Sequence, residues 1–496
     1  MELTYCNPLS IADIPDGRPL DASLSKIWSE DDYRSISDPS VIYHDGKWIM
    51  YPSYQVAYVT EDFVHWKHVD VGVHDVRYSP AIAHFRGKWY MLGHGMADLY
   101  CSDSPTGPFT VCGQMTGLDG QIKRTADACF LADGDHLYIY YPQSVKVDGM
   151  QYCLATMGAE LNPDRPWEYL TEPVELYRAD PSIQWHRWGE HNQEGRFLYL
   201  EGQWAIKKNG RYYILFSSGG TEFSSYAHGI ILSEEGPLSG FRPQKRHDPL
   251  TRKDFGLVRG AGHGSIAEGP NGTLWIFYTC RHNFNHLFER RVGMDPLGID
   301  EDGELYCPAT TETPQFAPGV LEHPEKGNDA GLLPLTFMMR PTVSSAAPGR
   351  DGLYAVDDSI LTWWQPAQDD PAPTITVPLS DGLPCTVSAA RILWRDVGMD
   401  CRDGVDPDLL QYFGVDNTVN IKPGPFRYVL EYADSKKQDS WQILVDASEN
   451  TEDLCIDYRQ FEPVSAYAIR LRILGAPNGI TPGLTSITAF GLCENN

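Results

Sequence analysis

Residues 37–51 read SDPSVIYHDGKWIMY, which is an acidic residue, a short apolar run, a polar turn and then an aromatic-rich run. Apolar β-branched and aromatic residues on either side of an Asp-Gly pair are typical of two strands joined by a tight turn. The stretch therefore predicts a β-hairpin. Asp38 alone says little about function, because Asp before Pro is a common turn initiator.

The same pattern returns along the chain, with starts about 40 to 75 residues apart, as SPAIAHFRGKWYML (79–92), DACFLADGDHLYIY (127–140), EGQWAIKKNGRYYILF (201–216) and HGSIAEGPNGTLWIFY (263–278). The spacing leaves room for two outer strands in each unit, as in VAYVTEDFVHWKHV (56–69) and HGIILSEEGPLSGFRP (228–243). Five four-stranded units predict an all-β, five-bladed β-propeller. A pair of β-sandwiches is the alternative, but it would not need one motif that recurs in the same phase.

The first position of each repeat holds, to within one residue, Asp38, Ser79, Asp127, Glu201 and His263. The innermost strands of a propeller surround a central channel, so equivalent positions on different blades converge there. We therefore expect three carboxylates and a histidine to meet at one end of the axis. The alternative is that each acid only caps its own turn.

Most glycosidases use two catalytic carboxyl groups that face each other. One donates a proton, and the other activates water or attacks directly. A third acid nearby helps, because like charges raise the pKa of the group least able to ionise. The aromatic residues Tyr54, Tyr78 and Trp185 lie near repeat starts and are candidates for stacking on a sugar ring. The alternative for each of them is a place in the propeller core.

Oxygen ligands beside His263 could also form a metal site. His263 lies between glycines in GAGHGS, a tight loop from which it could hold a calcium ion directly or through water. It could equally be a hydrogen-bonded core histidine. A structural Ca²⁺ in the channel is therefore one expectation, and the chemistry itself requires no cofactor.

The chain has 496 residues, a net charge of −27 and 11 cysteines. The acidic balance argues against nucleic acid as a partner, because phosphate binding needs a basic surface. The odd number of cysteines, without a CxxC pair, predicts reduced thiols rather than a disulfide framework or a zinc site. With no basic and apolar leader and no membrane-length apolar run, we expect a cytoplasmic protein without membrane contact.

These motifs resemble glycoside hydrolase family 43, the five-bladed propeller glycosidases with an inverting mechanism. The resemblance spans roughly residues 30–315 and includes the five repeats, GAGHGSIAE and FERRVGMDPLGIDEDGELY. It implies that Asp38 is the general base, Glu201 the general acid and Asp127 the acid that adjusts pKa and holds orientation. It also implies that His263 is the channel histidine, which in the family often approaches a calcium ion through water.

The resemblance further places Tyr78 where relatives often have a platform for the terminal sugar. One of Arg290 and Arg291 matches an arginine that reaches the sugar and the tuning acid, with Arg290 preferred. Two positions depart from the family pattern, since Ala128 and Gln203 replace residues that are often proline. Neither change removes a functional group, but both loosen the backbone beside the acids.

The implied activity is exo-acting, inverting hydrolysis that releases one terminal sugar from short glycan fragments of plant or microbial origin, inside a bacterial cell. GTEFSSYAHGIILSEEGPLSGF and the later FERRVG look like the branch that acts on furanosides. This ranks α-L-arabinofuranose first, β-D-galactofuranose second and β-D-xylose third. Non-enzymatic alternatives are a carbohydrate-binding propeller and a calcium-dependent scaffold. The oligomeric state is left open.

The character of the chain changes from about Pro314, where a connector rich in Pro and Gly begins. The segments PTITVPL, YVLEYAD, WQILVDAS, YAIRLRIL and SITAFGL predict an antiparallel β-sandwich. We therefore expect a catalytic propeller over residues 1–320 and an accessory domain over 335–496. AVDDSILTWWQP, SWQILVDAS and AIRLRILG resemble the discoidin-like (coagulation factor type C) sandwich. That domain could bind sugar or only brace the propeller.

Overall fold

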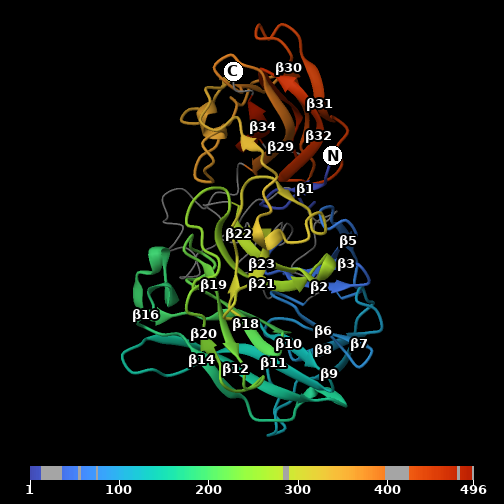
Figure 1. The fold of residues 1–496 in the computed structure, drawn as a ribbon, viewed down its shortest axis with the longest axis vertical. Helices are drawn as coiled ribbons and strands as arrows, with labels where there is room; N and C mark the ends of the chain where they lie inside the picture. The colour runs from blue at the N-terminus through green and yellow to red at the C-terminus, as the bar shows by residue number, and fades with distance from the viewer. Residues whose placement is uncertain are drawn as a thin grey trace.

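The computed structural model describes residues 1–12, 36–53, 57–73, 76–282, 290–396, 424–477 and 481–493. Its regular elements in these ranges are β-strands and the short 3-10 helices η1 (Gln184–His186), η2 (Glu190–Asn192), η3 (Pro270–Gly272), η4 (Pro324–Lys326) and η5 (Gly352–Ala355). No helix in these ranges is long and apolar enough to cross a membrane. The all-β prediction is confirmed, and the strands form a larger and a smaller part (Figure 1).

The larger part consists of five sheets that follow one another along the chain. The first two contain β2 (Ser40–His44), β3 (Lys47–Tyr51), β4 (Ala57–Thr60) and β5 (Lys67–Val69), then β6 (Ala81–Phe85), β7 (Lys88–Leu92), β8 (Asp98–Ser102) and β9 (Thr110–Gln114). The fourth and fifth contain β17 (Glu201–Lys208), β18 (Arg211–Ser218), β19 (Ala227–Ser233) and β20 (Arg242–Pro243), then β21 (Arg259–Glu268), β22 (Leu274–Arg281), β23 (Arg290–Ile299) and β24 (Leu305–Tyr306). All four sheets have the predicted four strands in chain order.

The hairpin turns follow from their sequences. Asp45–Gly46 joins β2 to β3, Arg86–Gly87 joins β6 to β7, and Asn209–Gly210 joins β17 to β18. All six residues have a positive φ, between 48° and 79°. Two-residue turns of this kind match the right-handed twist of the strands, and Gly, Asn and Asp adopt the left-handed conformation at least cost.

Hydrophobic clusters between neighbouring sheets close the ring. The first and second sheets share Ile49 and Ile82, and similar clusters join the second to the third, the third to the fourth and the fourth to the fifth. Val41 and Trp48 of the first sheet pack with Phe277 of the fifth. Because the last sheet packs against the first, the five sheets form a closed five-bladed propeller.

The third blade is larger than the four strands that the sequence predicts. It contains β10 (Cys129–Asp133), β11 (His136–Ser144), β12 (Tyr152–Asn162), β13 (Arg165–Tyr169), β14 (Val174–Arg178), β15 (Arg187–Trp188) and β16 (Glu194–Leu198). The 11-residue strand β12 is long enough to pair with β13, β14 and β16 along its length. The segment 143–200 is therefore built largely of strands.

The smaller part is an antiparallel β-sandwich. One sheet contains β26 (Leu333–Pro334), β34 (Pro482–Cys493), β29 (Cys385–Asp396) and β32 (Ile456–Ala466), and the other contains β27 (Thr342–Val343), β28 (Thr374–Pro378), β33 (Ala468–Gly475), β30 (Arg427–Ala433) and β31 (Gln442–Ala447). All five predicted strands are present. Trp364 is fully buried in the core between the sheets. The predicted boundaries at 320 and 335 lie between β24 and β28, and the discoidin-like identity stays a prediction.

The prediction that all cysteines are reduced is wrong for one pair. Cys385 at the start of β29 and Cys493 at the end of β34 form a disulfide. The two residues are 108 positions apart in the sequence, but they face each other across neighbouring antiparallel strands. The spacing of cysteines along the chain could not reveal this pairing, because it depends on the register of two distant strands.

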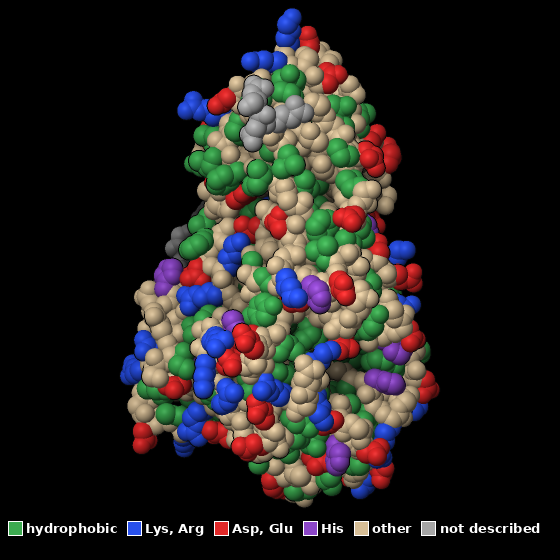
Figure 2. Space-filling model, in the orientation of Figure 1, with side chains coloured by type: hydrophobic (Ala, Val, Ile, Leu, Met, Phe, Trp, Pro, Cys, Tyr) green, Lys and Arg blue, Asp and Glu red, His purple; other side chains and the backbone are tan. Residues whose placement is uncertain are grey.

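The chain ends of the propeller meet the sandwich. Strand β1 (Thr4–Tyr5) pairs with β25 (Gln315–Phe316), so the N-terminal segment lies beside the connector that follows β24. The backbone N–H of Thr4 also donates to Gln460 of β32, at 3.1 Å. Over the face of the molecule shown in Figure 2, acidic and basic side chains are interspersed rather than separated into blocks.

Candidate active site

The repeat starts share one backbone conformation. At this position four blades carry a non-glycine residue with a φ between 41° and 50°: Asp38, Ser79 and Asp127, each two residues before the innermost strand, and His263, within it. In the fourth blade the residue with positive φ is Gly202, at 64°, and Glu201 comes one residue earlier. A left-handed residue at the mouth of each blade kinks the strand there. The kink explains why the sequence phase agreed only to within one residue.

Glycine is required at position 202 for two reasons. Its φ is +64°, and a Cβ atom there would lie 2.8 Å from the ring of His263. The ring cannot easily move, because His263 Nε2 lies 2.8 Å from Ser79 Oγ. The next residue, Gln203, is buried and donates to Thr156 Oγ1 at 3.2 Å, which anchors the kink to the third blade.

We expect Gly202→Ala to destabilise the protein by more than the roughly 1–2 kcal/mol that a left-handed Cβ costs, and to reduce turnover because it displaces His263 or Glu201. Gly210→Ala is the matched control, since its φ is +79° but its Cβ would meet nothing within 4 Å. Thermal unfolding and turnover of both variants give the comparison. Equal losses of stability with unchanged turnover would contradict a close contact at Gly202.

Asp38 lies in a buried, positively charged setting. Arg290 approaches it with both terminal nitrogens, Nη1 to Oδ1 and Nη2 to Oδ2, each at 3.0 Å. Ser53 Oγ donates to Oδ2 at 2.6 Å, and the backbone N–H of Asp38 donates to Thr279 Oγ1 at 2.7 Å. Burial alone would raise the pKa of Asp38, but the charges of Arg290 and His263 and the hydrogen bond of Ser53 together outweigh it, so the pKa is lowered. The carboxyl group is therefore held as a carboxylate.

Asp127 pairs with His94, which follows β7 in the second blade. His94 Nδ1 lies 2.8 Å from Asp127 Oδ1. Burial raises the pKa of Asp127, but the charge and hydrogen bond of His94, together with the charges of His263 and Arg290, lower it more, to about 2. Asp127 therefore carries a fixed negative charge in the site.

Glu201 has the opposite electrostatic setting. Burial raises the pKa of Glu201 well above its ordinary value, and the negative charge of Asp127 raises it further. The Tyr226 hydroxyl donates to Glu201 Oε1 at 2.7 Å, which opposes the rise without reversing it. Asp38 and Glu222 are also close enough to add to the shift. The structure thus brings the three predicted carboxylates together and separates their pKa values.

His263 links two blades to Asp38. Its Nδ1 lies 3.4 Å from Asp38 Oδ1, its Nε2 lies beside Ser79, and its backbone N–H donates to Ser217 Oγ at 2.7 Å. Both ring nitrogens therefore have protein partners. Among the residues that the structure describes, no group of three or more His, Cys, Asp or Glu could hold a metal ion. These residues do not fit a direct calcium site, and a water-mediated one stays a prediction.

The predicted sugar-binding residues have different placements. Tyr54 lies outside the described residues. Tyr78 is half-buried and packs edge-to-face on His94, with ring centroids 5.7 Å apart, so it stands beside the Asp127 pair. Trp185 is not brought to the carboxylates, because it stacks on Phe216 in the core between the third and fourth blades.

The two adjacent arginines of β23 diverge. Arg290 binds Asp38, and its Nη1 also donates to Thr221 Oγ1 at 2.9 Å. Arg291 extends the other way, toward the sandwich, where its Nε donates to Cys455 Sγ at 2.9 Å. Successive side chains on a strand point to opposite faces, so only one of the pair can reach the site. Arg290 is therefore the member of the pair that lies in the site, where its described hydrogen bonds go to Asp38 and Thr221 rather than to the tuning acid Asp127.

Residues that the sequence did not indicate complete the site. Each carboxylate has a partner near the end of a second hairpin strand or in the loop that follows it. The partners are Ser53 and Thr279 for Asp38, His94 for Asp127 and Tyr226 for Glu201. In an antiparallel hairpin the end of the second strand returns to the start of the first. Scanning the residues that follow each second strand would therefore have found Ser53 and His94.

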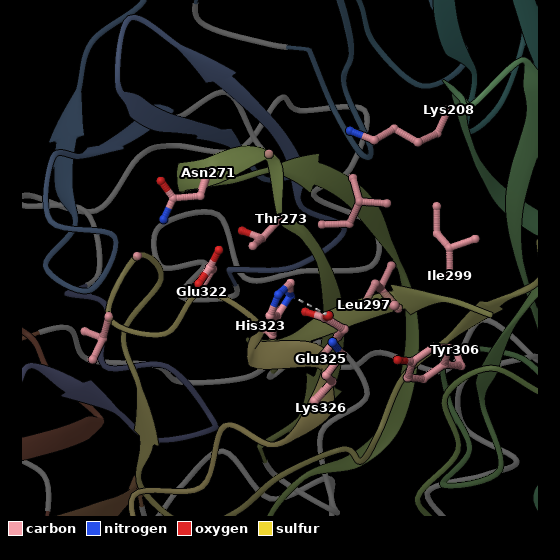
Figure 3. Close-up of a pocket in the computed structure, with 15 residues that line it drawn as sticks. Lys208, Asn271, Thr273, Leu297, Ile299, Tyr306, Glu322, His323, Glu325 and Lys326 are labelled. Atoms are coloured by element: carbon pink, nitrogen blue, oxygen red, sulfur yellow. Dashed lines mark ion pairs between the residues drawn. The ribbon is translucent and has the colours of Figure 1, made fainter. Parts of the chain in front are cut away.

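A cavity of about 840 Å³ lies elsewhere, at the other end of the fourth and fifth blades (Figure 3). Its lining includes Lys208, the last residue of β17, and Thr273 in the turn between β21 and β22. His323 and Glu325 form an ion pair on its wall, 3.3 Å apart. None of the predicted site residues lines this cavity, so it is separate from the carboxylate cluster.

Comparison with known proteins agrees with this geometry. The sequence matches the model of glycosyl hydrolases family 43 over residues 34–305, more than half of the 496-residue chain. A β-D-galactofuranosidase of Aspergillus niger is 29% identical over 110 residues, which are 22% of this chain and 31% of that relative. The chain therefore spans less than a third of that relative's length.

One solved structure shows the same fold. A thermostable family-43 glycoside hydrolase superposes with a TM-score of 0.50 at 21% sequence identity. The match covers 64% of this chain and 100% of the hydrolase chain. The structure of an α-L-arabinofuranosidase of Lactobacillus brevis matches with a TM-score of 0.46 at 19% sequence identity. That match covers 62% of this chain and 96% of the arabinofuranosidase chain. With its propeller, its three carboxylates and its match to the family model, the chain belongs to glycosyl hydrolase family 43, whose enzymes hydrolyse glycosidic bonds with inversion.

Proposed function

We propose that this hydrolase removes a terminal furanosyl residue from short oligosaccharides, with Asp38 as general base, Glu201 as general acid and Asp127 as the group that adjusts the pKa of Glu201. The observation that carries the proposal is the separation of pKa values within one carboxylate cluster. Asp38 is held ionised and Glu201 is held protonated. Pairs of titratable groups whose environments push their pKa values apart are the acid and base of many hydrolases.

In the proposed reaction, the Asp38 carboxylate accepts a proton from water as the water oxygen attacks the anomeric carbon. The proton of Glu201 passes to the glycosidic oxygen, which leaves as an alcohol. Attack and departure occur on opposite faces of the sugar, so the anomeric configuration inverts. Arg290 keeps Asp38 ionised between turnovers, and the negative charge of Asp127 keeps Glu201 protonated.

The choice of sugar rests on sequence rather than on the site. GTEFSSYAHGIILSEEGPLSGF resembles the branch that acts on furanosides, which places α-L-arabinofuranose first. β-D-Galactofuranose is the second candidate, favoured by the Aspergillus niger relative, and β-D-xylose is the third. The first two are furanosides, so a furanosyl substrate is the part of the proposal with the broadest support.

We expect kcat/KM for 4-nitrophenyl α-L-arabinofuranoside or 4-nitrophenyl β-D-galactofuranoside to be at least about tenfold higher than for 4-nitrophenyl β-D-xylopyranoside. The Asp38→Asn protein measured alongside should release almost no 4-nitrophenol. Equal or greater activity on the xylopyranoside would contradict the furanoside assignment while leaving the catalytic roles intact. Turnover that is unaffected by Asp38→Asn would contradict those roles.

A further inference from the structure

The sandwich contacts the strand end that carries Arg290. Arg290 and Arg291 are the first residues of β23, and both are almost fully buried. Arg291 Nε donates to Cys455 Sγ of the sandwich at 2.9 Å, and its Nη1 donates to the carbonyl oxygen of Arg290 at 2.7 Å. One guanidinium therefore joins the sandwich to the backbone of the arginine that binds Asp38.

The carbonyl oxygen of Arg290 is also tied to the first blade. It accepts a hydrogen bond from the backbone N–H of Ile36 at 3.2 Å, two residues before Asp38. This one carbonyl group thus connects the backbone at Arg290 with the backbone just before Asp38. A shift of Arg291 would move this carbonyl, and with it the approach of Arg290 to Asp38.

A second bridge lies beside the first. His282 follows β22, and its Nε2 lies 3.1 Å from the carbonyl oxygen of Trp394 in the sandwich. The backbone N–H of Trp394 donates to the carbonyl oxygen of Cys455 at 2.8 Å, so both bridges end on one paired segment. Leu257, just before β21, packs in the same place in a buried cluster with Ile360, Leu393, Cys455 and Ile456. The end of the fifth blade nearest the site is therefore held by the sandwich.

We propose that Arg291 is a positioning residue through which the sandwich, at Cys455, holds Arg290 against Asp38, so that the C-terminal domain is part of the catalytic apparatus. The inference rests on the proposed role of Asp38 as general base. The competing possibility is a brace that stabilises the propeller without affecting the chemistry. The two differ in the acidic side of the pH profile, because Arg290 lowers the pKa of Asp38 only while the bidentate contact is held.

The test compares Arg291→Lys with Cys455→Ala and Cys455→Ser in the full chain. In Arg291→Lys and Cys455→Ala we expect kcat to fall about 10- to 100-fold with a smaller change in KM, because the base is misplaced rather than the sugar contacts. The acid limb of kcat/KM should also move upward by about one pH unit as Arg290 loosens. Cys455→Ser keeps a hydrogen-bond acceptor and should restore most of the activity and the wild-type acid limb.

Arg391→Lys is the matched control. Arg391 is also a fully buried arginine between the two parts, donating to the carbonyl oxygens of Asn7 and Glu312, but it makes none of the described contacts to Arg290. It should lower Tm without moving the acid limb. If Arg291→Lys and Arg391→Lys behave alike, or if Cys455→Ala leaves the acid limb in place, the proposal is overturned. Should Arg291→Lys fail to fold, the Cys455 pair decides. Failure of the catalytic roles would instead appear as full turnover by Asp38→Asn.

Discussion

The Asp38→Asn protein is expected to lose about 10²- to 10⁴-fold in kcat, the range that positioned general bases contribute, while still binding the terminal sugar. Asparagine has nearly the same shape as aspartate and can accept a hydrogen bond from Ser53, but its amide cannot take a proton from water. It also leaves the buried Arg290 without its counter-charge, so a fall in Tm should accompany the loss of turnover.

Two controls separate lost chemistry from lost structure. Asp45→Asn changes the same residue type in the same hairpin, at an exposed turn position with a similar left-handed φ of 48°, and should retain full activity. Azide added to the Asp38→Asn protein should restore product release, because this anion attacks without a general base and leaves as a glycosyl azide of inverted configuration. Sugar binding measured by calorimetry should persist. Complete loss of binding would mean that the variant reports on folding rather than on Asp38.

The propeller could be predicted because its signals are local. Each blade begins with a hairpin, and a two-residue turn such as Asp45–Gly46 or Asn209–Gly210 sets the register of both strands. The recurrence of one phase then indicated which ends converge. The offset at Glu201 shows the limit of this reasoning, because a glycine takes the kinked position there and moves the acid by one residue.

Contacts between segments that are distant in the sequence were harder to predict. The position of His94 just after a second hairpin strand could indicate that it lies near the site, but not that its partner is Asp127 of another blade. Cys385 meets Cys493 across 108 residues, and no local pattern marks that pair. Trp185 illustrates a different limit. Its aromatic surface suits a sugar or a core equally well, and only packing against Phe216 reveals the latter. The resemblance preferred Arg290 to Arg291, but only the structure shows that Arg291 points to the sandwich.

The Glu201→Gln protein is expected to discriminate between leaving groups. 4-Nitrophenolate departs readily as an anion, so hydrolysis of a 4-nitrophenyl furanoside should fall only modestly. Hydrolysis of a furanosyl-linked oligosaccharide, whose leaving oxygen needs a proton, should fall about 10²- to 10⁴-fold. Glu222→Gln is a matched control in which a neighbouring carboxyl is neutralised. It should spare both substrates, since Glu222 contributes to the pKa of Glu201 only as a secondary charge.

The pH profile supplies the decisive comparison, because the active forms of the two acids differ. Asp38 must be ionised, and its pKa is lowered, so activity persists on the acid side until the pH falls below the ordinary carboxyl range. Glu201 must be protonated, and its pKa is raised, so activity persists on the alkaline side until the pH rises through that elevated value. Glutamine cannot ionise, so Glu201→Gln should abolish the basic limb of kcat/KM and leave the acid limb unchanged. A basic limb that survives in Glu201→Gln would belong to another group, for which His94, His263 and Tyr226 are candidates because each lies beside one of the carboxylates. That result would refute the role of Glu201 as general acid.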